Sequence, residues 1–171
     1  MVKHFADLYG IDRDFFKHRK DELFNLLDVH EFADRRIGKL SSGMRQKVSI
    51  VRAIIHDPDV IVFDEPTVGL DVVTSRNIVQ LIRDCRDNQK TILFSTHRMG
   101  EVSLLSDALA IIYKGSLRYC GAYDAFQSQM ASPSLEDEFI RIVEGAPGTI
   151  RPSPSSRKRP SRLYATGAQW S

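Results

Sequence analysis

Three short, mostly apolar runs constrain the fold of this chain most strongly. They are Val60 to Phe63, Thr91 to Ser95 and Ala108 to Tyr113. Such runs are typical of strands that are buried on both faces of a sheet. Helical patterns separate them, over about Val72 to Arg86 and about Glu101 to Leu105. Strands that alternate with helices predict an α/β fold with a mainly parallel sheet.

The segments on either side of this region are predicted to be mostly helical. The first 37 residues carry apolar side chains at helical spacing. A helix is expected from about Met44 to His56, and two more near Ala122 to Met130 and Leu135 to Val143. Leu117 to Cys120 follows a Lys-Gly-Ser turn and is expected to form a hairpin with the third strand.

Composition excludes several classes of protein. The longest uninterrupted apolar run, Ala108 to Tyr113, has six residues, whereas a membrane-spanning helix needs roughly 18–20. The N-terminus lacks the apolar core of a signal peptide, so the chain is expected to stay on the synthesising side of the membrane. Cys85 and Cys120 are the two cysteines and form no CxxC pair, which argues against a disulfide framework or a zinc site.

The net charge of +2 is unevenly distributed. The segment from Gly145 to Ser171 contains basic residues and no acidic ones, and it is rich in proline and serine. This composition predicts a disordered basic tail. The tail could contact anionic lipid or nucleic acid, or be solvated without a partner, and no specific nucleic-acid partner is expected. Its basic residues are Arg151, Arg157, Lys158, Arg159 and Arg162.

Two adjacent carboxylates directly follow the first apolar run. Asp64 and Glu65 come after Val60 to Phe63, at the carboxyl end of the predicted strand, where open α/β sheets bind ligands. One carboxylate can hold Mg²⁺, directly or through water, while the next orients and deprotonates an attacking water. Phosphoryl transfer needs both tasks performed close together. A solvated acidic turn is the alternative interpretation.

A histidine follows the next predicted strand. His97 comes after Ser95 and Thr96, and it projects from the same edge as Glu65 if the two strands are neighbours. It could then hydrogen-bond a transferring phosphoryl group or position the attacking water. A histidine with a purely structural role is the alternative.

Two predicted helix N-termini carry capping residues, and the first of them can alternatively bind an anion. Ser41, Ser42 and Gly43 open the helix expected from about Met44. A hydroxyl, a glycine and free backbone N–H groups in that position can form an anion site, but N-capping by a serine is also expected there. Asp71 stands at the start of a later helix and is a natural N-cap.

In this order and spacing, the motifs resemble the C-terminal half of an ABC-type ATP-binding domain. Leu40–Gln46 resembles the signature motif, Val60–Glu65 the Walker B strand with its catalytic glutamate, Gly69–Asp71 the D-loop and His97 the switch histidine. The resemblance covers roughly residues 1 to 144. It implies a partial P-loop NTPase (RecA-like) core with a mainly parallel sheet, plus part of the ABC helical subdomain.

Three segments are similar to those of ATPase subunits of ABC-2-type exporters, which include sodium, drug and polysaccharide export systems. They are Gly43–Gln46, Asp64–Asp71 and Ser134–Phe139. Three positions depart from the commoner pattern of the family. Ser42 replaces a glycine, Met44 replaces a glutamine, and Val72 stands where a proline often begins the helix after the D-loop.

The Walker A loop, GxxxxGK[S/T], does not occur in the 171 residues. The sequence Gly38-Lys39 is followed by Leu40 and does not fit it. The resemblance therefore implies a fragment, a truncated reading frame or one piece of a split subunit, inactive on its own. It divides the chain into a helical subdomain remnant (1–56), the C-terminal half of the ATPase core (57–144) and the basic tail (145–171).

In such ATPases, two domains face head to tail, and each ATP lies between the phosphate loop of one and the signature of the other. The resemblance implies that Ser41, Ser42 and Gly43 contact the γ-phosphate of a nucleotide held by a second ATPase domain, and that Asp71 lines the dimer interface. It also implies a membrane permease as partner, hence a peripheral position on the cytoplasmic face of the membrane.

The implied cofactors are ATP and Mg²⁺ (magnesium). Asp64 would serve the metal, Glu65 would be the general base, and His97 would contact the γ-phosphate.

Three functions fit these features. The first is an ABC export ATPase subunit that is catalytic when complete. The second is a non-catalytic interaction module that lends its signature motif to an intact ATPase or binds a permease. The third is an ABC-type ATPase that acts on DNA or ribosomes, which the basic tail favours weakly.

Overall fold

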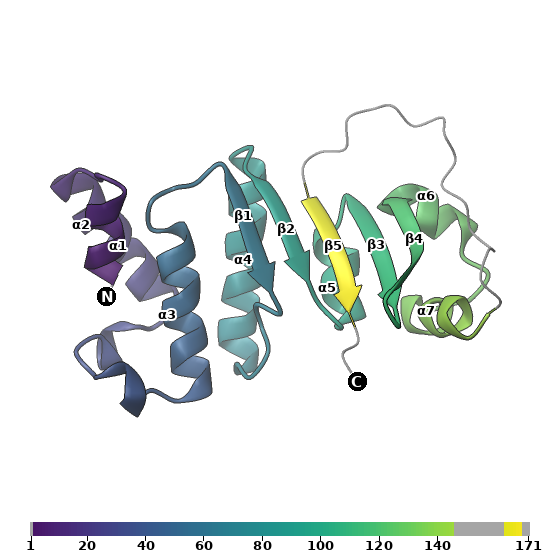
Figure 1. The fold of residues 1–171 in the computed structure, drawn as a ribbon, viewed down its shortest axis with the longest axis horizontal. Helices are drawn as coiled ribbons and strands as arrows, with labels where there is room; N and C mark the ends of the chain where they lie inside the picture. The colour runs from purple at the N-terminus through teal and green to yellow at the C-terminus, as the bar shows by residue number, and fades with distance from the viewer. Residues whose placement is uncertain (1, 146–162, 169–171) are drawn as a thin grey trace. The chain divides into compact units, whose positions relative to one another are not determined.

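A computed structural model describes residues 2–145 and 163–168 of the chain (Figure 1). The chain forms two compact units, of which the first comprises Met1–Ile61 and Pro66–Leu81 and the second Val62–Glu65 and Ile82–Ser171. Among the described residues, no helix is both long enough and apolar enough to cross a bilayer. The predicted domain boundaries stay predictions.

The first unit contains helices in the first 37 residues and near Met44 to His56, as the sequence predicts. They are α1 (Val2–Leu8), α2 (Arg13–Leu26) and α3 (Ser42–Ile54), with 3₁₀ turns at His30–Phe32 and Ile37–Lys39. Both α1 and α2 pack against α3. The helix predicted from Met44 begins two residues earlier. The buried apolar residues of α3 are Val48, Ile50, Val51 and Ile54.

The sheet has the strand order β1-β2-β5-β3-β4. Its strands are β1 (Val60–Asp64), β2 (Thr91–Ser95), β3 (Ala108–Tyr113), β4 (Ser116–Ala122) and β5 (Leu163–Ala168). Strands β2 and β3 both run parallel to β5, whereas β3 and β4 form the predicted antiparallel hairpin. The predicted α/β fold with a mainly parallel sheet is therefore confirmed.

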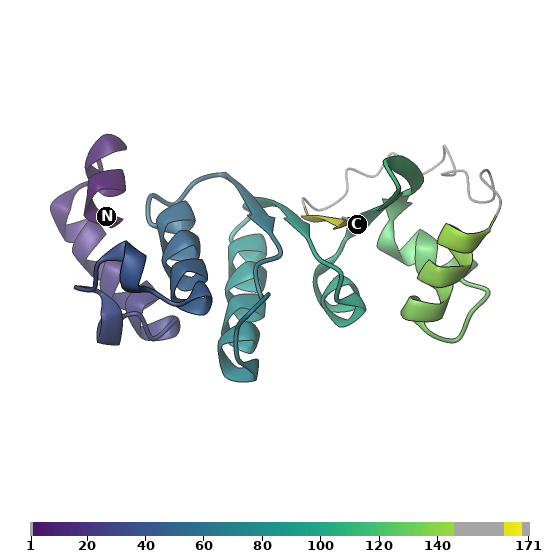
Figure 2. The same cartoon turned by 60° about the horizontal axis from the view of Figure 1, so that its bottom comes forward.

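The remaining helices follow the strands in the predicted order. They are α4 (Val72–Asp87), α5 (Met99–Leu105), α6 (Tyr123–Gln129) and α7 (Leu135–Glu144). Within the second unit, α5 contacts β5, and α6 contacts β3 and β4 (Figure 2).

The first two strands are not buried on both faces, so that prediction is wrong. In β1, Ile61 and Phe63 are 3% and 5% exposed, whereas Val60 and Val62 are 62% and 65% exposed. Successive side chains of a strand point to opposite faces, and in β1 one of these faces is left open. Leu93 of β2 is also exposed. A run of apolar residues thus identified the strand but not the number of covered faces.

The prediction of a disordered tail is wrong for residues 163–168. These residues form β5 between β2 and β3. Strand pairing uses backbone N–H and C=O groups, which every residue except proline can supply in full. The four prolines of the tail all precede residue 163, so a composition averaged over the whole segment hides a stretch that can pair. The other residues of the predicted tail, 146–162 and 169–171, lie outside the described residues.

A buried carboxylate fixes the start of α7. The Glu138 side chain is 0% exposed. It accepts hydrogen bonds from the backbone N–H groups of Ala131 and Ser132, both at 3.1 Å, and from Arg141 Nε at 3.0 Å. The Arg141 guanidinium, with help from the two backbone amides, lowers the pKa of Glu138 to about 2.

Glu138→Gln should therefore destabilise the fold near neutral pH, by about 2 kcal/mol, since a buried charged hydrogen bond is worth roughly that. Because folding lowers the pKa from 4.5 to about 2, the ionised group stabilises the fold above pH 4.5, and this contribution is lost as the pH falls towards about 2. Urea unfolding at neutral and acidic pH measures both effects. The exposed neighbour Glu136 provides the control, and equal losses for Glu136→Gln would contradict the prediction.

Candidate functional site

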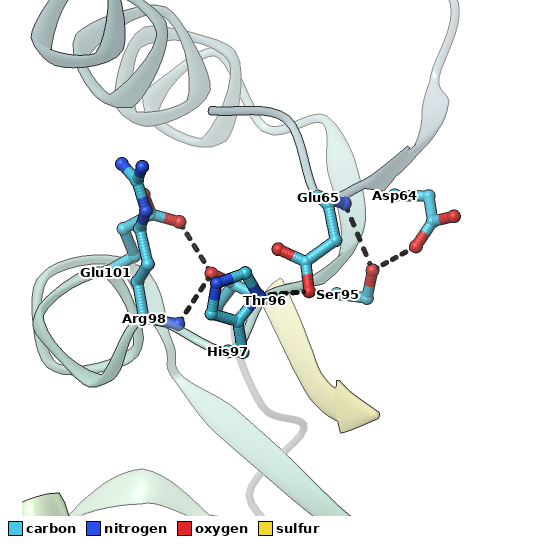
Figure 3. A network of polar contacts seen from close by, with 7 residues as sticks. All are labelled: Asp64, Glu65, Ser95, Thr96, His97, Arg98 and Glu101. Atoms are coloured by element: carbon cyan, nitrogen blue, oxygen red, sulfur yellow. Dashed lines mark hydrogen bonds and ion pairs between the residues drawn. The ribbon is translucent and has the colours of Figure 1, made fainter. Parts of the chain in front are cut away.

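Asp64 and Glu65 lie at the end of β1 and are both tied to Ser95 at the end of β2. The Glu65 backbone N–H donates to Ser95 O at 3.1 Å and to Ser95 Oγ at 3.2 Å. The Ser95 hydroxyl in turn donates to Asp64 Oδ1 (Figure 3). One serine therefore fixes the backbone of one acidic residue and the side chain of the other.

Glu65 and His97 meet at this edge, as the sequence predicts. Nδ1 of His97 lies 2.9 Å from Glu65 Oε1 (Figure 3). The Glu65 side chain is 28% exposed and that of His97 is 58% exposed, so both can be reached from solvent. The two residues therefore form a carboxylate–imidazole pair at the carboxyl ends of β1 and β2.

The backbone at Glu65 is in an unusual conformation. Its φ is +45°, in the left-handed region that costs a residue with a side chain on the order of 1 kcal/mol. The hydrogen bonds to Ser95 hold it there. Such conformations collect at functional sites, where they aim a side chain that ordinary backbone would turn elsewhere.

In the first unit, Ser41 caps α3 as one interpretation of the sequence predicted. Its Oγ accepts the Met44 backbone N–H at 3.2 Å. The hydroxyl proton is not used in that bond, so Ser41 can still donate it to an anion. Ser42 and Gly43 form the first turn of α3, whose N–H groups have no carbonyl partner within the helix. Capping and anion binding are thus compatible here.

The segments that resemble the signature motif and the D-loop lie against each other within the first unit. A methyl group added to Gly43 would lie 3.1 Å from Gly69 O and 3.3 Å from the Leu70 side chain. Gln46 Nε2 donates to Pro66 O at 3.3 Å. Gly69 has a φ of +74°, which explains the glycine at this turn. A side chain at position 43 would therefore crowd the D-loop.

Asp71 is the N-cap of α4, as predicted. Its carboxylate accepts the Thr74 backbone N–H at 2.8 Å and the Thr74 hydroxyl at 2.7 Å. These bonds, the hydroxyl first, lower the pKa of the Asp71 carboxyl. Its predicted place at a dimer interface remains a prediction.

The sequence interpretation gave no role to Ser95 or Gln46. Ser95 is the last residue of β2, which lies next to β1 in the sheet, and this position at a strand end was the signal that could have singled it out. Gln46 contacts Pro66, twenty positions later in the chain, and nothing in its local sequence indicates that contact.

The carboxylate edge has donors of the type that Mg²⁺ prefers. Mg²⁺ is usually bound by one or two carboxylates together with waters and substrate phosphates. Asp64 is exposed and carries the Ser95 hydroxyl beside its carboxylate, so this pair of oxygen ligands fits a magnesium ion that shares its remaining positions with phosphate oxygens.

Comparison with known proteins agrees with these features. Residues 9–68 match the sequence model of the ABC transporter family. ABC transporter ATP-binding protein NatA of Bacillus subtilis is 41% identical over 145 residues, which cover 84% of this chain and 59% of NatA. Nod factor export ATP-binding protein I of Burkholderia lata is 36% identical over 129 residues, covering 75% of this chain and 41% of that protein.

A solved ATP-binding subunit of an ABC transporter shares the fold. It superposes with a TM-score of 0.75 at 24% identity, over 82% of this chain and 60% of the solved chain. The chain thus spans about three-fifths of the length of NatA and of this structure.

The parallel sheet, the carboxylates at the ends of its strands and the capped helix α3 fit the fold of an ABC transporter ATP-binding subunit. Together with the matched sequences, they place the chain in the family of ABC transporter ATP-binding domains.

Proposed function

We propose that this chain provides the hydrolytic edge and the signature motif of an ATPase that drives an ABC exporter. The observation that carries the proposal is the 2.9 Å contact between His97 Nδ1 and Glu65 Oε1, beside Asp64. At this sheet edge, Glu65 can act as a base, His97 can hydrogen-bond a phosphate oxygen and Asp64 can bind a metal ion. Phosphoryl transfer to water requires these three tasks close together.

Glu65 is the general base in this proposal. Its carboxylate takes a proton from the water that attacks the γ-phosphorus, and the bond from that phosphorus to the ADP oxygen breaks. The Ser95 bonds to its backbone keep the side chain from turning away. Pairing with His97 Nδ1 leaves Nε2 as the ring atom that meets a phosphate oxygen, as a donor when that nitrogen is protonated.

Asp64 would hold Mg²⁺, with the Ser95 hydroxyl fixing the rotamer of its carboxylate. Bound Mg²⁺ neutralises phosphate charge as it develops in the transition state.

Ser41, Ser42 and Gly43 would bind the γ-phosphate of ATP held by a second ATPase domain. The free hydroxyl proton of Ser41 and the first-turn amides are suited to this because a helix N-terminus attracts anions. In the head-to-tail dimer, Asp71 and the D-loop that packs on Gly43 would lie at the interface.

The N-terminus of α3, with Ser41 as its cap, also suits a second candidate function. In that function, the chain is a non-catalytic module that lends its signature helix to an intact ATPase domain. The two functions differ in whether Glu65 affects turnover.

The exporter assignment draws on the relatives. One is named for Nod factor export, and the motif variants resemble those of ABC-2-type exporters. We propose that the chain acts at the cytoplasmic face of a membrane, bound to a permease.

A groove in the first unit is the proposed permease-binding surface. It has a volume of about 610 Å³ and is lined by apolar and basic residues. The basic residues of its lining outnumber the single acidic one, Asp34, so an amphipathic permease segment with acidic residues would suit the groove. These basic residues are Lys3, Lys20, Arg35 and Arg36. The apolar lining includes Phe16, Phe24, Val29, Phe32, Leu40 and Val48.

The variant Arg35→Glu/Arg36→Glu reverses two charges of the groove. The amount of protein that sediments with the membranes of the producing cells should fall on the order of tenfold, since two attractive pairs become repulsive. The control Arg13→Glu/Lys17→Glu changes two exposed cations of α2 that do not line the groove. Equal losses of membrane binding for both variants would contradict the assignment. It would also be contradicted if Arg35→Glu/Arg36→Glu lost binding to protein-free anionic vesicles to the same extent as binding to cell membranes.

The proposed function is tested with a chimera of NatA in which the 145 aligned residues are replaced by those of this chain. The remainder of NatA is expected to supply the phosphate-binding loop. Magnesium-dependent ATP hydrolysis that requires Glu65 supports the catalytic role, whereas hydrolysis indifferent to Glu65 favours the non-catalytic module.

A further inference from the structure

A buried acidic residue lies behind the candidate site and is not used by the mechanism above. Glu101 is 7% exposed and belongs to the first turn of α5. Its Oε2 accepts the hydroxyl of Thr96, which is 0% exposed, at 2.8 Å. In Figure 3, Glu101 lies on the side of His97 away from Asp64, and a dashed line joins it to the Thr96 hydroxyl.

The pair also holds the backbone that follows His97. The Arg98 backbone N–H donates to Thr96 Oγ1 at 3.1 Å. Arg98 Nη1 lies 3.6 Å from Glu101 Oε1. Thr96, which precedes His97, is therefore bonded to Glu101, and Arg98, which follows His97, is bonded to Thr96. The His97 side chain itself is 58% exposed.

An exposed side chain has many rotamers and a loop has many conformations, so contact with Glu65 needs a fixed backbone. A buried charge-assisted hydrogen bond is a strong way to fix it, because breaking it leaves a carboxylate or hydroxyl buried without that partner. Apolar residues could have filled the same space without the cost of burying polar groups. The buried Glu101 carboxylate is therefore suited to holding the His97 loop in one conformation.

We propose that Glu101, through Thr96, is the positioning residue for His97. This inference rests on the proposed function in that His97 acts at the γ-phosphate. Glu101 does not contact the reacting groups; its effect passes through the His97 loop.

The activity test uses the NatA chimera. Glu101→Ala and Thr96→Val should lower kcat on the order of 10- to 100-fold, because small misplacements of a catalytic group cost this much. The KM for ATP should change less than about twofold, since a group that acts mainly in the transition state contributes little to substrate binding. Thr96→Ser and Glu101→Gln keep the hydroxyl or an acceptor oxygen and should recover most of the rate. Glu136→Ala, an exposed acidic residue in the first turn of α7, is the matched control.

A double-variant comparison separates positioning of His97 from general loss of structure. If Glu101 acts through His97, Glu101→Ala should cause no further loss in a His97→Ala background. An equal loss in both backgrounds would overturn the proposal, as would equal rates for Thr96→Val and Thr96→Ser.

A second readout does not depend on turnover. In the 171-residue protein labelled with ¹⁵N-histidine, the ring-nitrogen signals of His97, assigned with His97→Ala, should shift in Thr96→Val and remain in place in Thr96→Ser and Glu136→Ala. Unchanged His97 signals in Thr96→Val would overturn the proposal. An inactive chimera whose His97 signals shift as expected would instead count against the proposed function and support the positioning of His97.

Discussion

Replacing Glu65 by glutamine in the NatA chimera should lower ATP turnover by about 10²–10⁴-fold, the range for loss of a general base. The substitution keeps the size of the side chain and a carbonyl oxygen that can face His97 Nδ1. It removes the negative charge that accepts a proton from water. The backbone N–H of Glu65 still bonds to Ser95, so the loop should keep its conformation.

Nucleotide binding should survive this change, because Glu65 is proposed to act on water and not on the nucleotide. ATP affinity measured at equilibrium should therefore stay within about twofold of the unsubstituted chimera, while kcat falls. Glu136→Gln provides a control with the same chemical change at an exposed site. A twofold loss of kcat for Glu65→Gln would remove Glu65 from the role of base and favour the non-catalytic module.

Much of the second unit could be predicted from short apolar runs and from the polar residues that end them. The bounds of β2 and β3 coincide with the runs Thr91 to Ser95 and Ala108 to Tyr113. Asp64, Glu65 and His97 follow two of these runs, and the neighbouring positions of β1 and β2 bring them to one edge. Local pattern and strand order together were sufficient for this part of the site.

The contacts that support the site could not be predicted in the same way, because they join residues far apart in the chain. Ser95 bonds to Asp64 across two strands, and Gly43 packs against Gly69. Both contacts depend on tertiary placement, for which no local pattern exists. The open face of β1 at Val60 and Val62 is a further example, since apolar composition does not tell which faces are covered.

The conformation of Glu65 shows why the site needs those distant contacts. A left-handed backbone at a glutamate is unfavourable by itself. The two bonds from its N–H group to Ser95 offset this cost. The local sequence therefore predicts the chemistry of the carboxylate, while the neighbouring strand determines its direction.

The 171-residue chain alone should show no magnesium-dependent ATP hydrolysis above background. A P-loop NTPase holds the β- and γ-phosphates with the backbone N–H groups and the lysine of GxxxxGK[S/T], and this motif is absent from the sequence. Gly38 and Lys39 cannot replace it, because they lie in a 3₁₀ turn that leads into the signature motif and not in a loop between a strand and a helix.

Phosphate release from the purified chain should therefore equal that of its Glu65→Gln variant prepared in parallel, which measures contamination by other ATPases. The NatA chimera, assayed beside them, should exceed both. Turnover by the chain alone that needs Mg²⁺ and is lost in Glu65→Gln would contradict this prediction. It would mean that other residues of these 171 hold the terminal phosphates, and that a phosphate loop is not required for Glu65 to act.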